Sequence, residues 1–447
     1  MKRIDNQRKF DTLREDFKTF TFMSQEVNLE DGALKLAFHF SLDNRYFFHP
    51  TMTIPSRPFF HWGDIPRTQL ESLAFHIGMV ELVSYWKLAC PKVVVVKPYN
   101  LLLCQKKWWR KLYYHGLGEF RYLNGIDCPE NEFVKIESAT DRDFSRVNLP
   151  LEEKAIVPIG GGKDSVVSLE LLRKEMEVIP LIMNPRGASV NCVEEAGYQE
   201  QAYAVVNRTL DPTMLKLNGE GFLNGHTPFS ALLAFVGLLV GYGSKSRYIA
   251  LSNESSANES TVLGKNINHQ YSKTIEFERD FRDYVRQHLS EEIQYFSFLR
   301  PLNEMQIASL FSKCEAYHEV FRSCNAGSKT DSWCGKCPKC LFTWLILSPF
   351  LSRERLRGIF GKDLLTDPTL RPIFEELNGT AEVKPFECVG TVEEVRACVD
   401  FMKDRDATIV ESSPRGAATV EEILGRFNEE HFLPERFVKL LKKQIHV

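Results

Sequence analysis

The pattern of hydrophobic and polar residues divides the chain into regions of different periodicity. Apolar side chains occupy every second position from Leu34 to Leu42, which is the period of a half-buried strand. A turn signal follows, so residues 45–54 are expected to return antiparallel. Apolar positions between 70 and 80 repeat at helical spacing, and residues 93–96 form a short apolar strand. This pattern predicts an α+β domain over residues 1–150.

From residue 151 to residue 345, apolar strands alternate with helices. The strands are expected over 155–159, 178–183, 214–217 and 247–252, and the helices over 166–174, 190–208 and 228–243. Repeated strand–helix units predict a parallel sheet with helices on both faces, and such sheets bind ligands beyond the carboxyl ends of their strands. Residues 346–447 are richer in helices and charge, with a capping box expected at Thr391 and Glu394. The predicted fold class is therefore α/β, with a parallel-sheet domain between an α+β N-terminal domain and a helix-rich C-terminal region.

Composition and charge argue against a nucleic-acid-binding, membrane-inserted or secreted protein. Hydrophobic residues make up 43% of the 447 positions, and the formal net charge is −3, so no nucleic-acid partner is expected for the chain as a whole. The apolar stretch 228–243 is shorter than the ~20 residues that span a bilayer, and no membrane insertion is expected. The 11 cysteines are not spaced as a small disulfide scaffold, and no secretory signal precedes them, which favours the cytoplasm. The sequence does not indicate an oligomeric state.

A glycine-rich loop directly follows the apolar strand 155–159. Its residues are Gly160, Gly161, Gly162, Lys163, Asp164 and Ser165. Glycines let the backbone bend tightly and point N–H groups at an anion, and the helix that follows offers its N-terminus to the same anion. Lys163 and Ser165 add a cation and a hydroxyl, and Asp164 can hold Mg²⁺ near phosphates. This order of groups predicts phosphate binding, with an ordinary turn as the alternative.

Four cysteines with the spacing C-x9-C-x2-C-x2-C form the second motif. They are Cys324, Cys334, Cys337 and Cys340. Four thiolates in tetrahedral geometry suit a structural Zn²⁺ with Zn–S distances of about 2.3 Å. A ferredoxin-type cluster needs a further Cys-Pro that does not follow here, and free buried cysteines are the other alternative. A closed four-cysteine site would support the fold and would not activate water.

Two other features are candidates for binding. Asn253 and Glu254 follow an expected strand and are predicted to border the nucleotide, with a simple loop as the alternative. The segment from Lys106 to Lys111 interleaves cations with two tryptophans. It is interpreted first as a solvated helix face anchored by the tryptophans, although stacking on uracil with diphosphate pairing and nucleic-acid binding are consistent with it.

The sequence does not identify a catalytic base. Cys388 precedes the helix capped by Thr391, and a helix N-terminus lowers the pKa of a thiol. A buried apolar cysteine is the simpler interpretation. His226 and His269 are alternatives, and each is also explained as a core or surface histidine. The catalytic residues are therefore left unassigned.

The glycine-rich loop resembles the pyrophosphate loop of the PP-loop ATPases, usually Ser-Gly-Gly-x-Asp-Ser, with Gly160 in place of the first serine. Together with the four cysteines, it is similar to the 7-cyano-7-deazaguanine synthase branch of these enzymes. Shared landmarks are Asn224–Pro228, Asn253-Glu254 and Phe298–Leu302. The resemblance covers about 155–345. It implies an adenine nucleotide alpha hydrolase-like core that cleaves ATP between its α and β phosphates and adenylates a substrate oxygen.

That synthase does not need the long segments on either side of this core, and the whole chain resembles the UDP-N-acetylmuramoyl-L-alanyl-L-glutamate epimerase family. The resemblance implies an isomerase of peptidoglycan biosynthesis that inverts the terminal L-glutamate of its nucleotide-linked substrate. It further implies use of ATP and Mg²⁺, release of AMP and pyrophosphate, and a role for residues 1–150 in recognising the UDP-linked substrate. Two alternatives stay open: an ATP-dependent ligase or amide/nitrile-forming synthase on the same core, and a tRNA-modifying PP-loop protein.

Overall fold

The computed structural model describes residues 3–259, 271–403 and 414–445. The chain forms two compact units, each assembled from several segments. Unit 1 consists of Met1–Lys154, Ala204–Ile249 and Gln270–Tyr295, and unit 2 consists of Ala155–Tyr203, Ala250–His269 and Phe296–Val447. The units interleave along the chain and do not follow the predicted boundaries at 150 and 345, so the three consecutive domains stay a prediction.

Unit 1 is built on a strongly apolar set of mainly antiparallel strands. These are β1 (Thr19–Glu30), β2 (Ala33–Leu42), β3 (Tyr46–Phe48), β4 (Thr51–Pro55), β5 (Val93–Val96), β6 (Lys135–Ser138) and β9 (Ala204–Thr209). Strand β2 pairs antiparallel with β1, β3 and β4, and β9 extends this arrangement antiparallel to β4. Strand β5 lies parallel to both β1 and β6. The predicted strand 34–42 and its antiparallel return are therefore confirmed.

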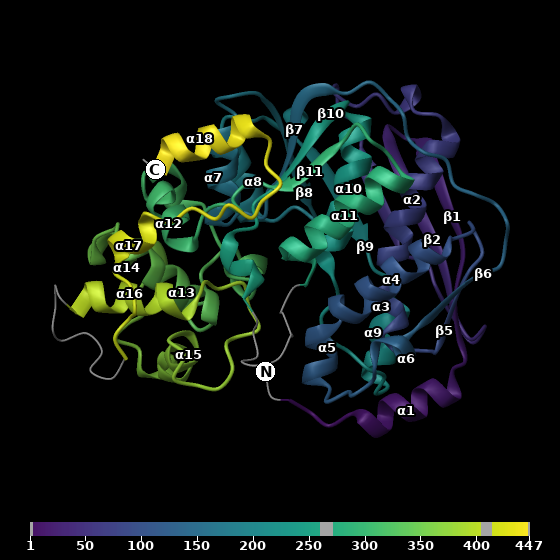
Figure 1. Ribbon diagram of the computed structural model, residues 1–447, viewed down its shortest axis with the longest axis horizontal. Helices are drawn as coiled ribbons and strands as arrows, with labels where there is room; N and C mark the ends of the chain where they lie inside the picture. The colour runs from purple at the N-terminus through teal and green to yellow at the C-terminus, as the bar shows by residue number, and fades with distance from the viewer. Residues whose placement is uncertain (1–2, 260–270, 404–413, 446–447) are drawn as a thin grey trace. The chain divides into compact units, whose positions relative to one another are not determined.

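Helices of unit 1 bury the apolar face of these strands. They are α1 (Gln7–Asp16), α2 (Arg67–Glu81), α3 (Val83–Trp86), α4 (Leu103–Gly116), α5 (Gly118–Leu123), α6 (Glu130–Phe133), α9 (Pro212–Gly219), α10 (Phe229–Gly243) and α11 (Ile275–His288). Gly78 of α2 lies so close to β1 and β2 that an added Cβ would come within 2.5 Å of the Phe22 ring and 2.8 Å of the Phe38 ring. Helix α10 packs beside α2 (Figure 1). Both helices were predicted from the sequence.

Two predicted elements are wrong, and local chemistry explains both. The helix expected over 190–208 ends at Glu195, since Gly197 takes a positive φ of +89°, and the β-branched Val205 and Val206 continue as strand β9. The strand expected over 214–217 lies in helix α9. Asp211 caps this helix by accepting a 2.8 Å hydrogen bond from the Thr213 N–H, with proline at the first helical position.

Unit 2 combines strands with a group of helices. Its strands include β8 (Glu177–Met183) and parts of β7 (Glu152–Pro158), β10 (Ser246–Leu251) and β11 (Gln294–Ser297), which are neighbours in the order β11-β10-β7-β8. The protein is thus α/β with a mixed, mostly parallel sheet, and the expected PP-loop core stays a prediction. Pro158 is the last residue of β7, where its missing N–H interrupts no ladder further along.

Unit 2 also contains a group of helices (Figure 1). They are α7 (Lys163–Leu172), α8 (Gly187–Glu195), α12 (Glu304–Ser312), α13 (Pro338–Leu347), α14 (Arg353–Phe360), α15 (Arg371–Leu377), α16 (Val392–Lys403), α17 (Val420–Leu424) and α18 (Glu435–Ile445). Helix α13 packs against α12, α14, α15 and α16, and its residues from Cys340 to Leu347 are all buried. The predicted capping box is confirmed, since the Thr391 N–H donates to Glu394 and the Glu394 N–H donates to the Thr391 hydroxyl.

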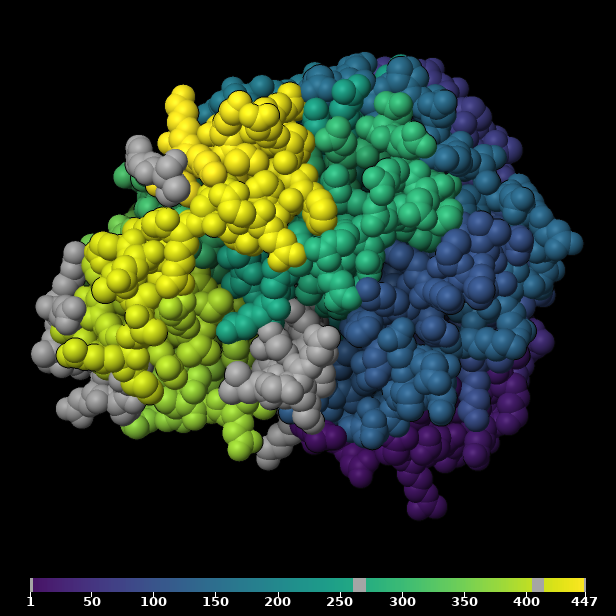
Figure 2. Space-filling view, viewed as in Figure 1, coloured from purple at the N-terminus to yellow at the C-terminus, as the bar shows by residue number. Residues whose placement is uncertain are grey.

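The surface facing the viewer in Figure 2 includes the C-terminal helix α18, in yellow. This helix is anchored by Phe437, whose ring centroid lies 5.4 Å from that of Phe296. In the part of the chain that the structure describes, no helix combines the length and the apolar character needed to cross a membrane.

Candidate functional site

The glycine loop, residues 160–165, joins the end of β7 to the start of α7. Gly161 has φ +85°, and a Cβ there would lie 2.7 Å from the Ala188 carbonyl carbon and 2.8 Å from the Ser189 nitrogen. Both the backbone conformation and the space therefore require glycine at this position. Gly162 is the N-cap of α7, and the Ser165 hydroxyl donates a 2.9 Å hydrogen bond back to its carbonyl. The loop thus brings the chain to the N-terminus of a ten-residue helix, where backbone N–H groups and the helix dipole favour an anion.

Side chains of opposite charge converge beside this helix N-terminus. Lys163 contacts the carboxylates of Asp164 and Glu304, and a carboxylate oxygen from each of Asp164, Glu254 and Glu304 lies within 4.8 Å of the others. We call these three residues the acid cluster. The side chains of Lys163 and Glu304 are each only 4% exposed, whereas that of Asp164 is 33% exposed. The site therefore combines three carboxylates and one ammonium group and is buried except at Asp164.

Burial and charge shift the proton affinities in this cluster. Burial raises the pKa of Glu304 well above its ordinary value, and the charges of Asp164, Glu254 and Glu394 add to that rise against the opposing effect of Lys163. Burial alone would lower the pKa of Lys163, but Asp164 and Glu304 outweigh it, so the pKa is raised. The cluster therefore holds protons tightly, as expected where negative charge is in excess. A divalent cation would relieve the same excess.

Glu304 is the site residue that the sequence did not reveal. It opens helix α12, whose N-cap Asn303 forms a capping box with Gln306. The Glu394 carboxylate accepts hydrogen bonds from the N–H groups of Glu304 at 2.7 Å and Met305 at 3.3 Å. The signal available in the sequence was the capped helix that follows the landmark Phe298–Leu302, since an acid in the first turn of such a helix lies near its N-cap.

The predicted pair Asn253 and Glu254 divides between two roles. Both residues are buried, with 7% and 8% exposure. Asn253 donates a 3.0 Å hydrogen bond to the Ser297 hydroxyl, which fixes the chain at the end of β10. Glu254 contributes a carboxylate to the acid cluster, and its backbone carbonyl accepts a 2.8 Å hydrogen bond from Arg300. The structure therefore brings Glu254 close to Asp164 of the glycine loop, and that the pair borders a nucleotide stays a prediction.

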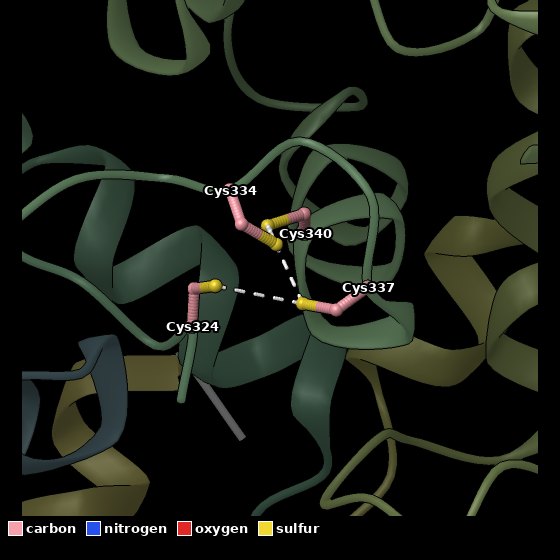
Figure 3. A group of neighbouring side chains, drawn as sticks. All are labelled: Cys324, Cys334, Cys337 and Cys340. Carbon is pink, nitrogen blue, oxygen red and sulfur yellow. Dashed lines mark hydrogen bonds between the residues drawn. The ribbon is translucent and has the colours of Figure 1, made fainter. Parts of the chain in front are cut away.

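The four cysteines form one compact cluster (Figure 3). The Sγ–Sγ distances are 3.6 Å between Cys324 and Cys337, 3.7 Å between Cys334 and Cys340, and 3.5 Å between Cys337 and Cys340. Tetrahedral Zn²⁺ with Zn–S bonds of about 2.3 Å separates its sulfurs by about 3.8 Å. Gly335 has a positive φ of +63°, as a tight turn between two ligands demands. The donor set and its spacing therefore fit the predicted zinc site.

The thiol chemistry of this cluster also favours a cation. Hydrogen bonds from Cys337 and Cys340 lower the pKa of the Cys324 thiol, and the hydrogen bond with Cys324 raises the pKa of Cys337 to about 12. By themselves the four sulfurs therefore cannot all ionise at neutral pH. A bound dication stabilises every thiolate at once, so metal binding at this cluster would release protons.

The cationic and aromatic segment 106–111 lies on helix α4, and its contacts support the structural interpretation. Trp109 is completely buried. The Trp108 indole N–H donates to the Asp280 carbonyl at 3.0 Å, and its ring lies 4.5 Å from that of Tyr284. Lys111 forms ion pairs of 2.6 Å with both Glu276 and Asp280. Since both tryptophans pack against the protein, the segment is an anchored helix face.

The candidate bases belong to different parts of the chain. His226 lies in unit 1, where its Nδ1 is 3.8 Å from a Glu119 carboxylate oxygen. Cys388 lies in unit 2 and is partly exposed, three residues before the cap of α16. His269 lies outside the described residues. The catalytic base therefore stays unassigned.

Comparisons with known proteins identify the family of the chain. A family model described as the MurL N-terminal domain matches residues 11–298, and one described as the MurL C-terminal domain matches residues 320–424. Three relatives carry the name UDP-N-acetyl-alpha-D-muramoyl-L-alanyl-L-glutamate epimerase. The protein from Micromonospora sp. is 33% identical over 404 residues, and alignment covers 87% of each chain. The proteins from Xanthomonas oryzae pv. oryzae and Salinispora tropica are 32% and 34% identical, with 88% of this chain and 87% of each relative covered. The chain therefore belongs to the UDP-N-acetyl-alpha-D-muramoyl-L-alanyl-L-glutamate epimerase family.

Proposed function

We propose that this protein is an ATP-dependent isomerase that inverts the terminal L-glutamate of UDP-N-acetylmuramoyl-L-alanyl-L-glutamate, a cytoplasmic precursor of peptidoglycan. The names of its relatives support the substrate and the inversion. The observation that supports the use of ATP is the convergence of Lys163, Asp164 and Glu304 at the N-terminus of α7. A glycine loop, an ammonium group and carboxylates at one helix end are the groups that hold a nucleoside triphosphate with its metal.

In this proposal the glycine loop binds the β and γ phosphates of ATP. The N–H groups at the start of α7 would point toward the anion. The Ser165 hydroxyl would join them only by turning its proton from the Gly162 carbonyl to a phosphate oxygen. Lys163 offsets part of the phosphate charge. Its buried position beside Glu304 fixes the ammonium group, so little conformational entropy is lost when the nucleotide binds.

The acid cluster would hold Mg²⁺ through oxygen atoms of Asp164, Glu254 and Glu304. Mg²⁺ prefers carboxylate and phosphate oxygens, and the spacing of these oxygens within 4.8 Å of one another suits a single ion. When bound, the ion neutralises charge on the leaving pyrophosphate. The ion would also lower the pKa of Glu304, because it stabilises the ionised carboxylate.

Adenylation explains why an epimerase would use ATP. The proton on the α-carbon of glutamate is very weakly acidic, because its loss creates a carbanion next to an existing negative charge. When a carboxylate oxygen attacks the α phosphorus and displaces pyrophosphate, that negative charge is removed. The α-proton can then leave one face and a proton can return on the other face. Water finally attacks the acyl carbon and releases AMP and the D-glutamyl product.

The four-cysteine cluster has a structural role in this proposal. We propose that Cys324, Cys334, Cys337 and Cys340 hold Zn²⁺, and that the closed site takes no part in the reaction. Cys337 is also the N-cap of α13, with proline at the first helical position. The metal would therefore fix the start of α13, which packs against α12, α14, α15 and α16.

A second candidate is an ATP-dependent ligase or amide/nitrile-forming synthase, which the combination of glycine loop and cysteine cluster also suits. The two functions differ in the mass of the product. A synthase requires ammonia or another acceptor and changes the mass of its substrate, whereas an epimerase leaves the mass unchanged and inverts one centre. A tRNA-modifying role would instead require salt-sensitive tRNA binding.

The test is incubation of the purified protein with ATP, Mg²⁺ and UDP-N-acetylmuramoyl-L-alanyl-L-glutamate, followed by chiral analysis of the hydrolysed glutamate. We expect D-glutamate to form only when ATP is present. In D₂O the product should contain deuterium at the α-carbon. Inverted product without the label would rule out removal and return of the α-proton, and unchanged L-glutamate would contradict the epimerase function.

A further inference from the structure

The glycine loop lacks one hydroxyl that loops of similar sequence usually contribute. Gly160 stands where the resembling PP-loop pattern has serine. An added Cβ at Gly160 would meet no atom within 4 Å, so the fold itself does not exclude a larger side chain there. A phosphate bound by this loop would therefore have fewer donors from the loop itself, unless another segment supplies one.

A serine from a distant part of unit 2 lies against the loop on the side of Gly162. A Cβ on Gly162 would come within 2.9 Å of the Ser323 Oγ and 3.8 Å of its Cβ. Gly162 is the N-cap of α7, and at this position a side-chain oxygen ordinarily reaches the first N–H groups of the helix. The Ser323 hydroxyl thus lies beside the place that a capping side chain would occupy, at the edge of the predicted phosphate site.

Backbone contacts hold Ser323 in this place. The N–H of the preceding residue, Arg322, donates a 2.7 Å hydrogen bond to the Gly161 carbonyl. The following residue is Cys324, whose sulfur belongs to the four-cysteine cluster and accepts a 3.2 Å hydrogen bond from the Gly327 N–H. Ser323 is therefore fixed on both sides, by the glycine loop and by the cysteine cluster.

The Ser323 hydroxyl is also available for a ligand. It makes no hydrogen bond to any residue in the ranges 3–259, 271–403 and 414–445, and its side chain is partly exposed. In contrast, the Ser165 hydroxyl, which belongs to the loop, is bonded to the Gly162 carbonyl. A hydroxyl that is held in place, unbonded and next to a helix N-terminus is arranged to donate to an anion.

We propose that Ser323 supplies the hydroxyl missing at Gly160 and donates a hydrogen bond to the β or γ phosphate of ATP. This inference rests on the proposed function, since it assumes that the glycine loop binds ATP. It also links the cysteine cluster to nucleotide binding, because Cys324, a member of that cluster, directly follows the donor Ser323 and helps to fix its position. The phosphate site would then be built from two chain segments, 160–165 and 322–324.

The test compares ATP affinity in the full-length protein and its variants by calorimetry in the presence of Mg²⁺. Ser323→Ala is expected to weaken ATP binding about tenfold, as for loss of one hydrogen bond to a charged group. It should raise the KM for ATP and leave the KM for the muramoyl peptide unchanged. Gly160→Ser in the same chain should restore most of the lost affinity, because a hydroxyl at position 160 has free space.

Ser332→Ala is the matched control, since within the described part of the chain its hydroxyl hydrogen-bonds only to the Thr330 hydroxyl, at 2.9 Å. This variant should bind ATP like the wild type. Equal ATP affinity of wild type and Ser323→Ala would overturn this inference and leave the proposed function standing. If Ser323→Ala weakens binding but Gly160→Ser does not restore it, the idea of a replaced hydroxyl is wrong. Absence of ATP binding in the wild type would remove the proposed function and the inference together.

Discussion

Two lysines in this protein each pair with one aspartate and one glutamate, but their surroundings differ. Lys111, on α4 of unit 1, contacts Glu276 and Asp280, and Lys163, on α7 of unit 2, contacts Asp164 and Glu304. Opposing carboxylates raise the pKa of each ammonium group against the effect of burial. The side chain of Lys111 is 32% exposed, whereas that of Lys163 is 4% exposed.

The difference shows that burial, and not the ion pair itself, separates a structural contact from a site prepared for chemistry. Water screens the charges around Lys111, so two carboxylates beside one ammonium group cost little there. Around Lys163 a third carboxylate, from Glu254, joins the cluster, and the buried charges of Lys163 and Glu304 are screened less by solvent. Negative charge in excess at such a place favours a bound cation. The four cysteines of the cysteine cluster would, once ionised, likewise carry an excess of negative charge that favours a bound cation.

The largest expected effect follows from removing one ligand of the proposed zinc ion in the cysteine cluster. Cys340→Ser deletes a buried ligand, and we expect loss of bound zinc, measured by elemental analysis as one ion per chain in the wild type. The free energy of unfolding should fall by several kcal/mol, because metal binding and folding are coupled. Cys104→Ser, at an exposed position, is the control and should keep both zinc and stability. A wild-type protein without zinc would show that the sulfurs are merely packed together.

The next effect concerns the loop that brings Lys163 to its partners. Gly161→Ala places a Cβ 2.8 Å from the Ala188 side chain at a φ of +85°. We expect the free energy of unfolding to decrease by about 2–4 kcal/mol and ATP binding to be lost, as measured by denaturant unfolding and calorimetry. Gly160→Ala has free space and should change stability by less than about 0.5 kcal/mol. Equal effects of the two substitutions would contradict the loop geometry.

The most direct contrast between the two lysine sites uses their carboxylate partners. Glu304→Gln removes one charge from the acid cluster, and we expect the Mg²⁺ concentration needed for ATP binding to rise about tenfold. In the wild type the Mg²⁺ concentration needed for ATP binding should fall as pH rises. The reason is that the pKa of Glu304 is raised and cation binding displaces its proton. The variant should lose that pH dependence. Glu276→Gln, beside the exposed Lys111, should change neither property.

The smallest expected effect belongs to the exposed site. Lys111→Met breaks ion pairs with Glu276 and Asp280, yet we expect the free energy of unfolding to fall by only about 0–1 kcal/mol. Catalytic constants should match those of the wild type. If this substitution instead weakened binding of the UDP-linked substrate, then segment 106–111 would be a ligand site and the contrast between the two lysines would fail.

Much of the fold was predictable because it depends on local periodicity. The strands β2 and β8 and the helices α2 and α10 lie where the hydrophobic pattern predicted them. The pattern failed over 190–217, where short apolar runs suit either a helix or a strand. There the outcome was decided by Gly197 and the Asp211 cap, and by tertiary contacts that the sequence does not display.

The site was predictable where its residues are contiguous, and less so where they come from distant segments. The glycine loop and the four cysteines were identified from their spacing. Glu304 and Ser323 reach the loop only through the packing of α12 and of the segment before the cysteine cluster. Neither lies in a motif that names its partner, so a single sequence could not pair them with residues 160–165. The two tryptophans of 106–111 pack against the protein, in agreement with the interpretation preferred from the sequence, a helix face anchored by these side chains.

The transfer of an α phosphate to the glutamate carboxylate is the central claim, and oxygen labelling tests it most directly. The substrate is prepared with ¹⁸O in the α-carboxylate of its terminal glutamate and incubated with the protein, ATP and Mg²⁺. We predict that AMP acquires one ¹⁸O, detected by mass spectrometry, because the oxygen that attacks phosphorus leaves with it when water cleaves the acyl bond. Formation of D-glutamate with unlabelled AMP, with ADP, or with intact ATP would contradict the account.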